Sequence, residues 1–492
     1  MMINVTALLK NVPNYTCNHN IDEIMITSVE KDNREVKKGS LFVCIKGFTV
    51  DGHDFAQSAV ENGATVIVAE KELDVDIPVV RVSNTDLVLP ILANAFFQHP
   101  TQRLKLIGVT GTNGKTSVTH LIDEICKKNQ QQTGIIGTIE MRINDQVYPV
   151  KNTTPDALFL QKSFHQMVTE KVDTAIMEVS SHALDQGRVH GSEFDIAVFT
   201  NLTQDHLDYH PTMNHYLFAK SLLFAQLGNH YEVDKNKYAI INMDDKNSEF
   251  IIKATAQPVV TYGIEMQADF RAENIVLRAN GVSFDMKTPE GIVKINSKLM
   301  GLFSVYNMLA ASAAAFYSGV PLPLIQEVLA ETNGVNGRFQ PIENDLGIGV
   351  IVDYAHTPDS LQNVLTTIKS FSKAKIYVVV GCGGDRDRTK RPIMASVACQ
   401  LADQAIFTSD NPRSEDPLAI IKDMEKGLNA DNYQVVVDRE EAIKEAIHSA
   451  NEGDVILIAG KGHETYQIIG EEVLDFDDAE IAQRILTNLT RG

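Results

Sequence analysis

The fold of this 492-residue chain is decided by the stretch Val109-Thr110-Gly111-Thr112-Asn113-Gly114-Lys115-Thr116-Ser117. The apolar run 104–108 precedes this stretch, and residues 118–125 follow it. This order is typical of a strand, a glycine-rich turn and a helix. Backbone N–H groups of such a turn bind phosphates, while Lys115 would bind the terminal phosphates and the Thr116 hydroxyl Mg²⁺. The pattern predicts a nucleoside triphosphate site of the P-loop type, although Val109 stands where the strict motif has a glycine. The alternative is a glycine-rich turn that binds nothing.

Composition and charge exclude several classes of protein. The formal net charge of −20 argues against a nucleic-acid partner, because a phosphate polymer would be repelled. The chain has no apolar run of about 20 residues and begins without the features of a secretory signal. We therefore expect a cytoplasmic monomer without a membrane segment, whose partners are small molecules. The cysteines are scattered, which favours reduced, packed thiols over a metal site: Cys17, Cys44, Cys126, Cys382 and Cys399.

The distribution of apolar runs predicts an α/β protein of three domains, with boundaries at 1–100, 101–333 and 334–492. The central domain alternates strands and helices, as a mostly parallel sheet requires, and residues 269–298 indicate an inserted β-meander. The C-terminal domain is predicted to be doubly wound and Rossmann-like. Expected strands are 41–45, 65–69, 174–177, 196–199, 238–241, 350–352, 376–380, 404–407, 435–437 and 455–458, with helices at 55–63 and 305–317.

Polar side chains follow the expected central strands. Glu178 ends one strand on the sheet of the glycine-rich turn, where a magnesium ligand would lie, although an N-cap or ion-pair role is also open. The loop 201–210 is rich in His and Asp and could supply a second metal ligand. Lys220 lies in the apolar helical run 216–224. A lysine there is usually a snorkelling surface residue, but burial could instead leave a neutral amine that reacts with CO₂ to form a carbamate.

Charged loops also end the expected strands of the C-terminal domain. Arg338 and the stretch 353–358 could reach a nucleotide if the domains close. The loops 383–388, 410–413 and 460–464 combine arginines with Glu464, and such a set suits a small zwitterion, because guanidinium groups pair with carboxylates and Glu464 with an ammonium group.

Six motifs together make the chain similar to a known family: TGTNGKTS, EVSSHALDQGR, NLTQDHLDYH, DYAHTPD, GCGGDRDRTKRP and DNPRSEDP. In their order and spacing they resemble the Mur ligases of peptidoglycan synthesis, over nearly the whole chain. The resemblance implies a three-domain ligase whose first domain binds the UDP end of the substrate, the second ATP and the third the incoming amino acid. It implies that ATP phosphorylates the carboxylate of UDP-N-acetylmuramoyl-L-alanyl-D-glutamate and that the amine of meso-diaminopimelate attacks the acyl phosphate.

The resemblance also implies residue roles, position by position. Lys115, Glu178, His206 and Lys220 would be catalytic, and Mg²⁺ would be bound by Thr116, Glu178, His206 and the CO₂-derived carbamate of Lys220. ATP would be bound by Gly111, Thr112, Asn113, Gly114, Lys115, Thr116, Ser117, Asn307, Arg338 and Asp353, with His356 as a further candidate. The muramoyl peptide would be bound by Asn33, Thr153, Thr154, Ser180, Gln186 and Arg188. The diamino acid would be bound by Arg386, Asp410, Asn411, Pro412, Arg413, Gly460 and Glu464.

Arg413 is the residue that would select the amino acid. Family members that add meso-diaminopimelate have an arginine at this position, and a guanidinium group favours the second carboxylate that lysine lacks. Two positions depart from the family pattern: Asn33 replaces the usual serine, and Asn336 replaces a proline or serine. A lysine-adding enzyme, a paralogue with another acceptor, and a nucleotide-binding regulatory protein without ligase activity remain the alternatives.

Overall fold

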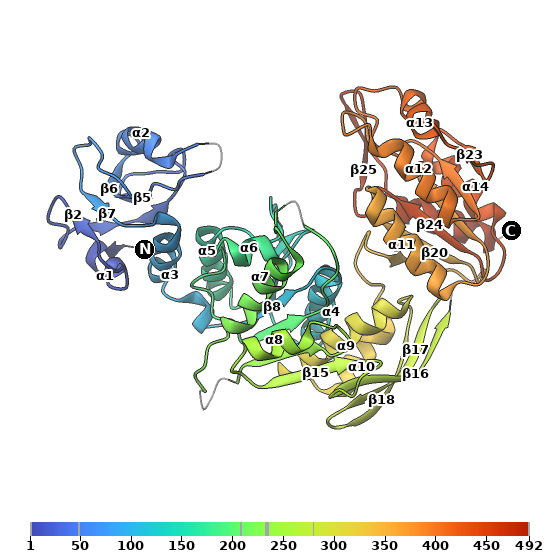
Figure 1. Ribbon diagram of the computed structural model, residues 1–492, viewed down its shortest axis with the longest axis horizontal. Helices are drawn as coiled ribbons and strands as arrows, with labels where there is room; N and C mark the ends of the chain where they lie inside the picture. The colour runs from blue at the N-terminus through green and yellow to red at the C-terminus, as the bar shows by residue number, and fades with distance from the viewer. Residues whose placement is uncertain (1, 48–49, 207–208, 232–235, 279, 491–492) are drawn as a thin grey trace. The chain divides into compact units, whose positions relative to one another are not determined.

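The computed structural model describes residues 2–47, 50–206, 209–231, 236–278 and 280–490. Leu207 and Asp208 of the His- and Asp-rich loop therefore lie outside the described residues. The chain divides into two compact units, Met1–Thr261 and Tyr262–Gly492, each of which mixes helices and strands (Figure 1). The expected α/β class is confirmed.

The first unit opens with a small sheet of strand order β2-β7-β6-β5-β4. Strands β4 to β7 are parallel to one another, and the expected strands 41–45 and 65–69 correspond to β5 and β6. The elements of this part are β1 (Ile3–Asn4), α1 (Val5–Leu9), β2 (Thr16–Cys17), β3 (Met25–Ile26), β4 (Ser28–Glu30), β5 (Ser40–Val43), α2 (Ala56–Glu61), β6 (Ala64–Ala69), β7 (Val79–Arg81) and α3 (Thr85–Phe96).

A second sheet forms the centre of the first unit, in the order β11-β10-β9-β12-β8-β13-β14-β15. Strands β9, β12, β8, β13 and β14 are parallel, as expected, and β10 and β11 form an antiparallel edge. The strands are β8 (Lys105–Thr110), β9 (Thr133–Ile136), β10 (Met141–Ile143), β11 (Gln146–Tyr148), β12 (Thr174–Glu178), β13 (Ile196–Phe199), β14 (Tyr238–Asn242) and β15 (Val259–Gly263). The helices are α4 (Lys115–Lys128), α5 (Ala157–Thr169), α6 (Ser181–Asp185), α7 (Met213–Ala225) and α8 (Ser248–Ala254).

The register of the central strands brings their polar ends together. Glu178 at the end of β12 is paired with Val109 of β8, and Phe199 at the end of β13 is paired with Thr110. Because the carboxyl ends of parallel strands meet at one edge of a sheet, the glycine-rich turn lies between the segments that follow β12 and β13.

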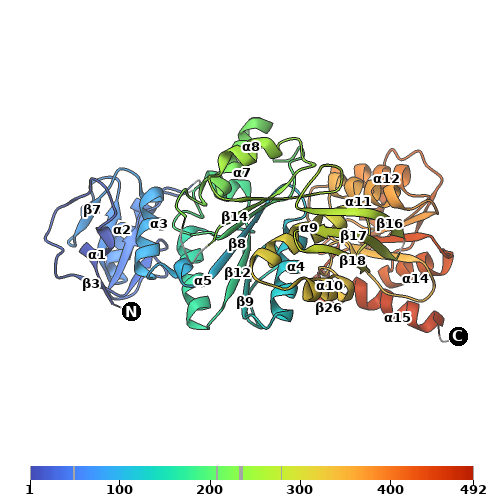
Figure 2. The ribbon, with the colours of Figure 1, turned by 90° about the horizontal axis from the view of Figure 1, so that it is seen from below.

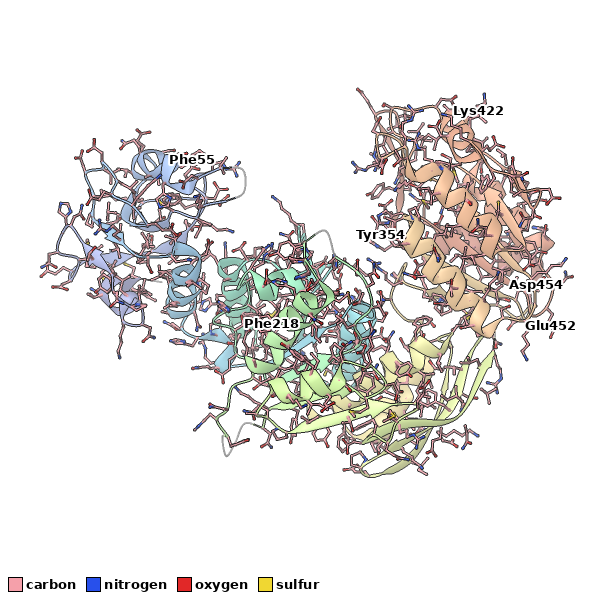
Figure 3. All side chains as sticks on the ribbon, viewed as in Figure 1. Phe55, Phe218, Tyr354, Lys422, Glu452 and Asp454 are labelled. Carbon is pink, nitrogen blue, oxygen red and sulfur yellow. The ribbon has the colours of Figure 1, made fainter. Side chains whose placement is uncertain are left out.

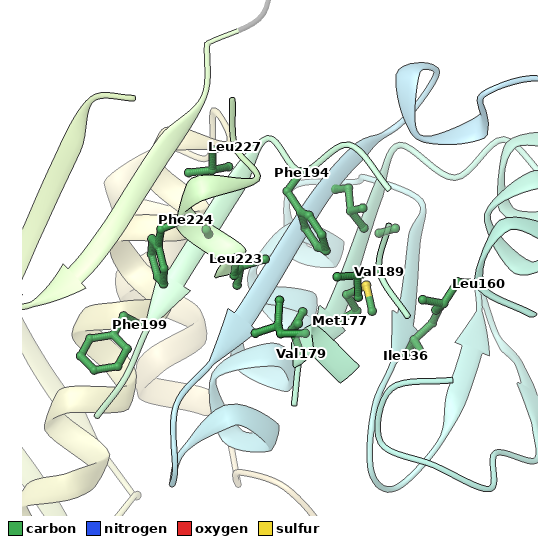
Figure 4. Packing of buried hydrophobic residues seen from close by; sticks show 14 of the residues in the cluster. Ile136, Leu160, Met177, Val179, Val189, Phe194, Phe199, Leu223, Phe224 and Leu227 are labelled. Atoms are coloured by element: carbon green, nitrogen blue, oxygen red, sulfur yellow. The ribbon is translucent and has the colours of Figure 1, made fainter. Parts of the chain in front are cut away.

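One face of this sheet carries a continuous apolar core (Figure 4). Met177 and Val179 from the β12 segment pack there with Leu223, Phe224 and Leu227 from the α7 segment. Side chains alternate between the two faces of a strand, so every second residue of β12 enters this cluster. The core holds α7 against the sheet, which decides where Lys220 lies.

The second unit begins with the expected β-meander. Strands β16 (Phe270–Arg278), β17 (Gly281–Thr288) and β18 (Gly291–Ser297) are antiparallel, in the order β16-β17-β18. Helix α9 (Leu302–Tyr317) follows, three residues longer at its start than the expected 305–317, and α10 (Leu322–Glu331) packs next to β18.

The last sheet has the order β19-β20-β24-β21-β22-β23. All of its pairs are parallel except β19–β20, and apolar clusters lie on both faces, since Val378 belongs to one cluster and Val379 to the other. Helices cover both faces, as the doubly wound prediction requires (Figure 2). The elements are β19 (Gln340–Pro341), β20 (Gly349–Asp353), α11 (Pro358–Phe371), β21 (Ile376–Val380), α12 (Lys390–Leu401), β22 (Gln404–Phe407), α13 (Pro417–Glu425), β23 (Tyr433–Val435), α14 (Arg439–Ser449), β24 (Val455–Ala459), β25 (Tyr466–Ile469), β26 (Glu472–Asp475) and α15 (Asp478–Thr490).

One strand prediction in this sheet is shifted. The expected strand 435–437 is found as β23, Tyr433–Val435, because the ladder with β22 starts earlier than the run of valines. Just past the end of β23, Val436 N still donates to the carbonyl oxygen of Phe407, the last residue of β22, at 3.0 Å. No helix within the described ranges is long and apolar enough to span a membrane.

Candidate active site

The glycine-rich turn between β8 and α4 is held by the loop that follows β13. Thr112 N donates to the Asn201 carbonyl oxygen at 2.9 Å, and Asn113 N donates to Asn201 Oδ1 at 3.0 Å. A β-carbon on Gly111 would lie 1.8 Å from Thr200 Oγ1, so only glycine fits there. Gly114 is the N-cap of α4 and has a φ of +87°, a conformation that favours glycine.

Lys115 is the first residue of α4 and folds back over this turn. Its Nζ donates to the carbonyl oxygens of Gly111 and Thr112, at 3.0 and 2.8 Å. The ammonium group is therefore within the turn itself, where terminal phosphates of a bound nucleotide would meet it.

Glu178 is completely buried and accepts three hydrogen bonds. The donors are Thr116 Oγ1 at 3.0 Å, Thr138 N at 2.8 Å and Thr138 Oγ1 at 3.0 Å. The N-cap of α6 is Ser180, so Glu178 does not have the capping role that its position after a strand left open. A carboxylate beside the hydroxyl of Thr116 is a set of hard oxygen donors that fits Mg²⁺.

Lys220 is buried, contrary to the usual behaviour of a lysine on an apolar helix. Its Nζ donates to the Gly111 carbonyl oxygen at 2.7 Å and lies 4.5 Å from the centre of the Tyr216 ring. Phe218, two residues earlier on α7, is 53% exposed (Figure 3), so the helix turns its lysine inward and a phenylalanine outward. Burial, with a smaller contribution from Lys115, lowers the pKa of Lys220 well below its usual range. The interpretation of Lys220 as a snorkelling surface residue is wrong.

His206 lies in the loop after β13, with its side chain 44% exposed and a φ of +53°. Its Nε2 lies 3.5 Å from Asp205 Oδ2, and its ring centre is 4.9 Å from that of His182 and 6.0 Å from that of Tyr216. His206 and Lys220 are therefore both neighbours of Tyr216. Within the described part of the chain, no three His, Cys, Asp or Glu residues form a group that could hold a metal ion.

Next to His206, the His- and Asp-rich loop 201–210 ends in a histidine pair whose second member, His215, was not predicted from the sequence. His210 is buried, its Nε2 is 2.9 Å from Ser181 Oγ, and its Nδ1 is 3.0 Å from His215 Nδ1. Burial, reinforced by the neighbouring histidines, lowers the pKa of His210 to about 4. The five-residue spacing of His210 and His215, across the start of α7, is the only sequence signal for this contact.

Of the six residues expected to bind the muramoyl peptide, all except Asn33 form one network beside Glu178. Thr154 Oγ1 donates to the Glu178 carbonyl oxygen at 2.9 Å and accepts from Ser180 N at 3.0 Å. Arg188 donates to the Thr154 carbonyl oxygen at 3.0 Å and to Gln186 Oε1 at 2.7 Å. Thr153 joins the network through Thr138, whose hydroxyl lies 3.1 Å from its own.

A cavity of about 590 Å³ adjoins this network in the first unit, and its walls include Gln186 and Arg188. Lys31 and Asp156 meet in its wall, with Nζ and Oδ2 3.0 Å apart. Asn33 is not among the described residues that line the cavity, and its Nδ2 donates to Ser58 Oγ at 3.0 Å. The sequence-based prediction selected Asn33 and missed six polar residues that line the cavity. Asp185 lies within the motif EVSSHALDQGR but was given no role, and no motif marks Lys31, Lys46, Asp86, Asp156 and His190.

In the second unit, Arg338 and Asp353 come together at the end of β20. Phe339 N donates to Asp353 Oδ2 at 2.8 Å, and the Arg338 guanidinium lies 5.3 Å from the centre of the Tyr354 ring. Burial raises the pKa of Asp353 to about 6. Arg338 Nε is buried without a hydrogen-bond partner in the described part of the chain. Tyr354, labelled in Figure 3, directly follows Asp353 at the turn between β20 and α11. Asn307 lies elsewhere in this unit, buried on α9, and His356 is exposed.

Three loops of the second unit pack against each other at the carboxyl ends of β21, β22 and β24. Gly384 N donates to the Asn411 carbonyl oxygen at 2.9 Å, and a β-carbon on Gly384 would lie 1.8 Å from the Pro412 carbonyl oxygen. Asn411 Nδ2 donates to Glu464 Oε2 at 2.8 Å. A β-carbon on Gly460 would lie 2.7 Å from Asp410 Oδ2, so the residues expected to bind the diamino acid are neighbours.

The side chain of Arg413 is held at the rim of these loops. Its Nη1 donates to the Gly384 carbonyl oxygen at 2.9 Å. Its backbone has a φ of +51° and is bonded on both sides to the β25 hairpin, through the Ile468 oxygen and Gly470 N. A β-carbon on Gly383 would lie 3.0 Å from Arg413 Nη1 and 3.8 Å from Arg386 Cγ, so the two arginines flank the same backbone.

Comparisons with known proteins cover nearly the whole chain. Residues 25–105 match the Mur ligase family, catalytic domain, residues 109–315 the Mur ligase middle domain, and residues 337–462 the Mur ligase, glutamate ligase domain. A curated Bacillus velezensis protein named UDP-N-acetylmuramoyl-L-alanyl-D-glutamate--2,6-diaminopimelate ligase is 59% identical over 466 residues, which are 95% of each chain. The chain belongs to the Mur ligase family.

Solved structures of Mur ligases share the fold of this Mur ligase. A structure of UDP-N-acetylmuramoyl-L-alanyl-D-glutamate--2,6-diaminopimelate ligase covers 100% of both chains, with a TM-score of 0.76 and 34% identity. The MurF ligase from Thermotoga maritima in complex with ADP covers 94% of this chain and 98% of its own, with a TM-score of 0.59, and at 17% identity it is a likeness of fold alone. The expected three-domain Mur ligase architecture is confirmed.

Proposed function

We propose that this Mur ligase uses ATP to join meso-diaminopimelate to UDP-N-acetylmuramoyl-L-alanyl-D-glutamate. The observation that carries the proposal is the 59% identity, over 95% of both chains, to the Bacillus velezensis protein of that name. The residues of the candidate site support it, because one unit has a glycine-rich turn that suits phosphates and the other has neighbouring loops that carry arginines and a carboxylate.

ATP is proposed to bind through Gly111–Ser117 in the first unit and through Asn307, Arg338 and Asp353 in the second. Backbone N–H groups of the turn and Lys115 would bind the phosphates. The stacked, partly unpartnered guanidinium of Arg338 and the carboxylate of Asp353 suit the base and sugar of a nucleotide.

Mg²⁺ is proposed to bind Thr116 and Glu178, with His206 and a carbamate of Lys220 as further ligands. Bound Mg²⁺ would neutralise charge on the phosphates during transfer. The contact of the Thr116 hydroxyl with Glu178 supports the first two ligands. The lowered pKa of Lys220 supports the carbamate, because a neutral amine is the form that reacts with CO₂.

The muramoyl peptide is proposed to bind along Thr153, Thr154, Ser180, Gln186 and Arg188, and to extend into the cavity lined by Lys31 and Arg188. Their cationic groups suit the diphosphate of the UDP end. Asn33 is proposed only as a residue near that end, since its side chain is bonded to Ser58.

The diamino acid is proposed to bind among the loops that carry Arg386, Asp410–Arg413, Gly460 and Glu464. Arg413 would bind the second carboxylate, and Glu464 an ammonium group. The γ-phosphoryl group of ATP would pass to the substrate carboxylate, leaving ADP. The amine nitrogen would then attack the acyl carbon, and the tetrahedral intermediate would lose phosphate and a proton to leave the amide.

The test is phosphate release from ATP in the presence of the UDP-dipeptide, with either meso-diaminopimelate or L-lysine. Release only with meso-diaminopimelate is expected. Release with lysine would contradict the proposed selectivity, and nucleotide binding without release in either case would favour a regulatory protein. A cytoplasmic monomer with domain boundaries near residues 100 and 333 is proposed as well, and light scattering of the purified chain tests the monomer.

A further inference from the structure

Lys461 is a fully buried lysine for which the proposed reaction has no role. It stands between Gly460 and Gly462, whose φ angles are +117° and +55°. A β-carbon on Gly462 would lie 2.6 Å from Tyr354 Cβ, and one on Gly460 would meet Asp410. The two glycines let the chain turn in a tight space, and the turn places a charged side chain inside the protein.

The ammonium group of Lys461 meets three oxygen atoms. Its Nζ lies 3.4 Å from Asn411 Oδ1 and 3.7 Å from Glu464 Oε2, and it donates to the carbonyl oxygen of Tyr466. A buried ammonium group requires such partners, because an unpaired buried charge is very unfavourable. Burial lowers the pKa of Lys461, and Asp410 and Glu464 oppose that shift.

These contacts hold the Asn411 amide in one orientation. Asn411 Oδ1 accepts from Ile468 N at 2.9 Å and faces Lys461 Nζ, while Nδ2 donates to Glu464 Oε2 at 2.8 Å. The opposite orientation would direct the NH₂ group at two donors and the amide oxygen at a carboxylate. Lys461 therefore stabilises the arrangement in which Asn411 and Glu464 are bonded.

We infer that Lys461 is a positioning residue for the amino-acid substrate, because it holds Glu464, directly and through Asn411, in place to receive the ammonium group of the diamino acid. The inference rests on the proposed function of the same site. Lys461 would not itself touch the substrate, since its side chain is fully enclosed, whereas 18% of the Glu464 side chain is exposed.

The test is Lys461→Met in the full-length enzyme, because methionine fills a similar volume without the charge. The KM for meso-diaminopimelate is expected to rise about tenfold or more, as expected for loss of a buried charged hydrogen-bond donor. The KM values for ATP and the UDP-dipeptide are expected to stay within about twofold of wild type. A merely structural lysine would instead lower stability and turnover without this selective change in KM.

Lys444→Met is the matched control, because Lys444 is an exposed lysine of the same unit that pairs with Glu441 at 3.1 Å. All three KM values are expected to stay unchanged in it. Lys461→Met combined with Glu464→Gln is expected to raise the KM for the diamino acid no more than the larger single effect, since both changes act through one carboxylate. A KM for the double variant that rises by the product of the two single effects would overturn the inference.

Circular dichroism and thermal unfolding establish whether each variant folds. If Lys461→Met does not fold, Lys461→Gln, which keeps a donor for Asn411 but not the charge beside Glu464, is expected to show the same selective rise in KM to a smaller extent. If the wild-type enzyme is active and a folded Lys461 variant has an unchanged KM for meso-diaminopimelate, the inference on Lys461 is overturned but the proposed function is not. Absence of phosphate release by the wild-type enzyme would overturn the proposed function.

Discussion

Lys220 and Asp353 are ionisable side chains that the fold buries, and burial shifts the pKa of each toward the neutral form. For Lys220 the result is an amine that loses its proton readily beside the Gly111 carbonyl oxygen. For Asp353 it is a carboxyl group that titrates near pH 6. At the scale of the residue, burial therefore gives each side chain a pKa that its residue type alone does not predict.

Lys220→Ala is expected to lower turnover on the order of 100-fold or more, because it removes the proposed anionic ligand next to the phosphates. Phosphate release measures the effect, and added bicarbonate is expected not to restore it. Lys253→Ala is the control, because Lys253 is an exposed lysine paired with Glu249. A ¹³C carbamate resonance from labelled bicarbonate is expected in the wild-type protein and not in Lys220→Ala. Near-normal turnover would refute the carbamate.

Arg413→Ala is expected to weaken selection of meso-diaminopimelate over L-lysine by roughly 10- to 100-fold, the range for a charge-assisted hydrogen bond. The ratio of kcat/KM for the two amino acids is the measurement. The KM for ATP serves as the internal control and should not change. An unaltered ratio would place selection elsewhere in the pocket.

Asp353→Asn is expected to raise stability above pH 6 but not below pH 4. Burial raises the pKa of Asp353 from 3.8 to about 6, so between these values the folded state keeps a proton that the unfolded state has lost. The wild-type free energy of unfolding therefore falls as pH rises through this window, by at most about 3 kcal/mol. Urea unfolding at pH 4, 5 and 8 measures the difference, and a variant-to-wild-type difference independent of pH would contradict the prediction.

In each unit, turns at the carboxyl ends of parallel strands shape the surroundings of the candidate residues. In the first unit, Gly111 lets the phosphate turn approach Thr200, and in the second unit Gly384 lets one loop approach Pro412. Within each unit, these close approaches bring candidate side chains from the ends of separate strands next to each other. At the scale of the element, glycine positions therefore control how tightly the loops pack.

Gly384→Ala is expected to raise the KM for meso-diaminopimelate and to destabilise the protein by about 1–3 kcal/mol, because the added β-carbon overlaps the Pro412 carbonyl oxygen. Steady-state kinetics and urea unfolding measure the two effects. Gly453→Ala is the control: Gly453 has a φ of +89°, so alanine strains the backbone there, but the added β-carbon meets only the Ala374 β-carbon at 3.8 Å. It should lower stability and leave the KM unchanged. Equal KM effects in both variants would contradict the loop-packing account.

At the scale of the whole molecule, the proposed ATP-binding residues are divided between the two units. Residues 111–117 belong to the first unit, and Asn307, Arg338 and Asp353 belong to the second. Nucleotide binding would therefore stabilise segments in both units, by the general linkage of ligand binding to the folded state.

Hydrogen exchange with and without ADP is expected to show slower exchange at the start of α4 and at residues 353–356. The meander β16–β18 serves as the internal reference and is expected to exchange at the same rate in both samples. Slower exchange confined to the first unit would contradict the roles proposed for Arg338 and Asp353.

The sequence by itself determined the parallel sheets, the glycine-rich turn before α4, the β-meander and the family. These features follow from local patterns, because apolar periodicity and glycine spacing are read over a few residues. The position of Glu178 near Thr116 was predictable as well, since parallel strands end at a common edge. Motif order over the whole chain indicated the Mur ligases.

Only the tertiary structure decided which side chains are buried and which partners they meet. Lys220 and Lys461 are enclosed by segments distant in sequence, Asn33 is bonded to Ser58, and His210 is bonded to His215. No local pattern distinguishes a buried lysine from an exposed one on an apolar helix. Burial depends on the packing of α7 and of the loops after β22 and β24, which many long-range contacts establish together.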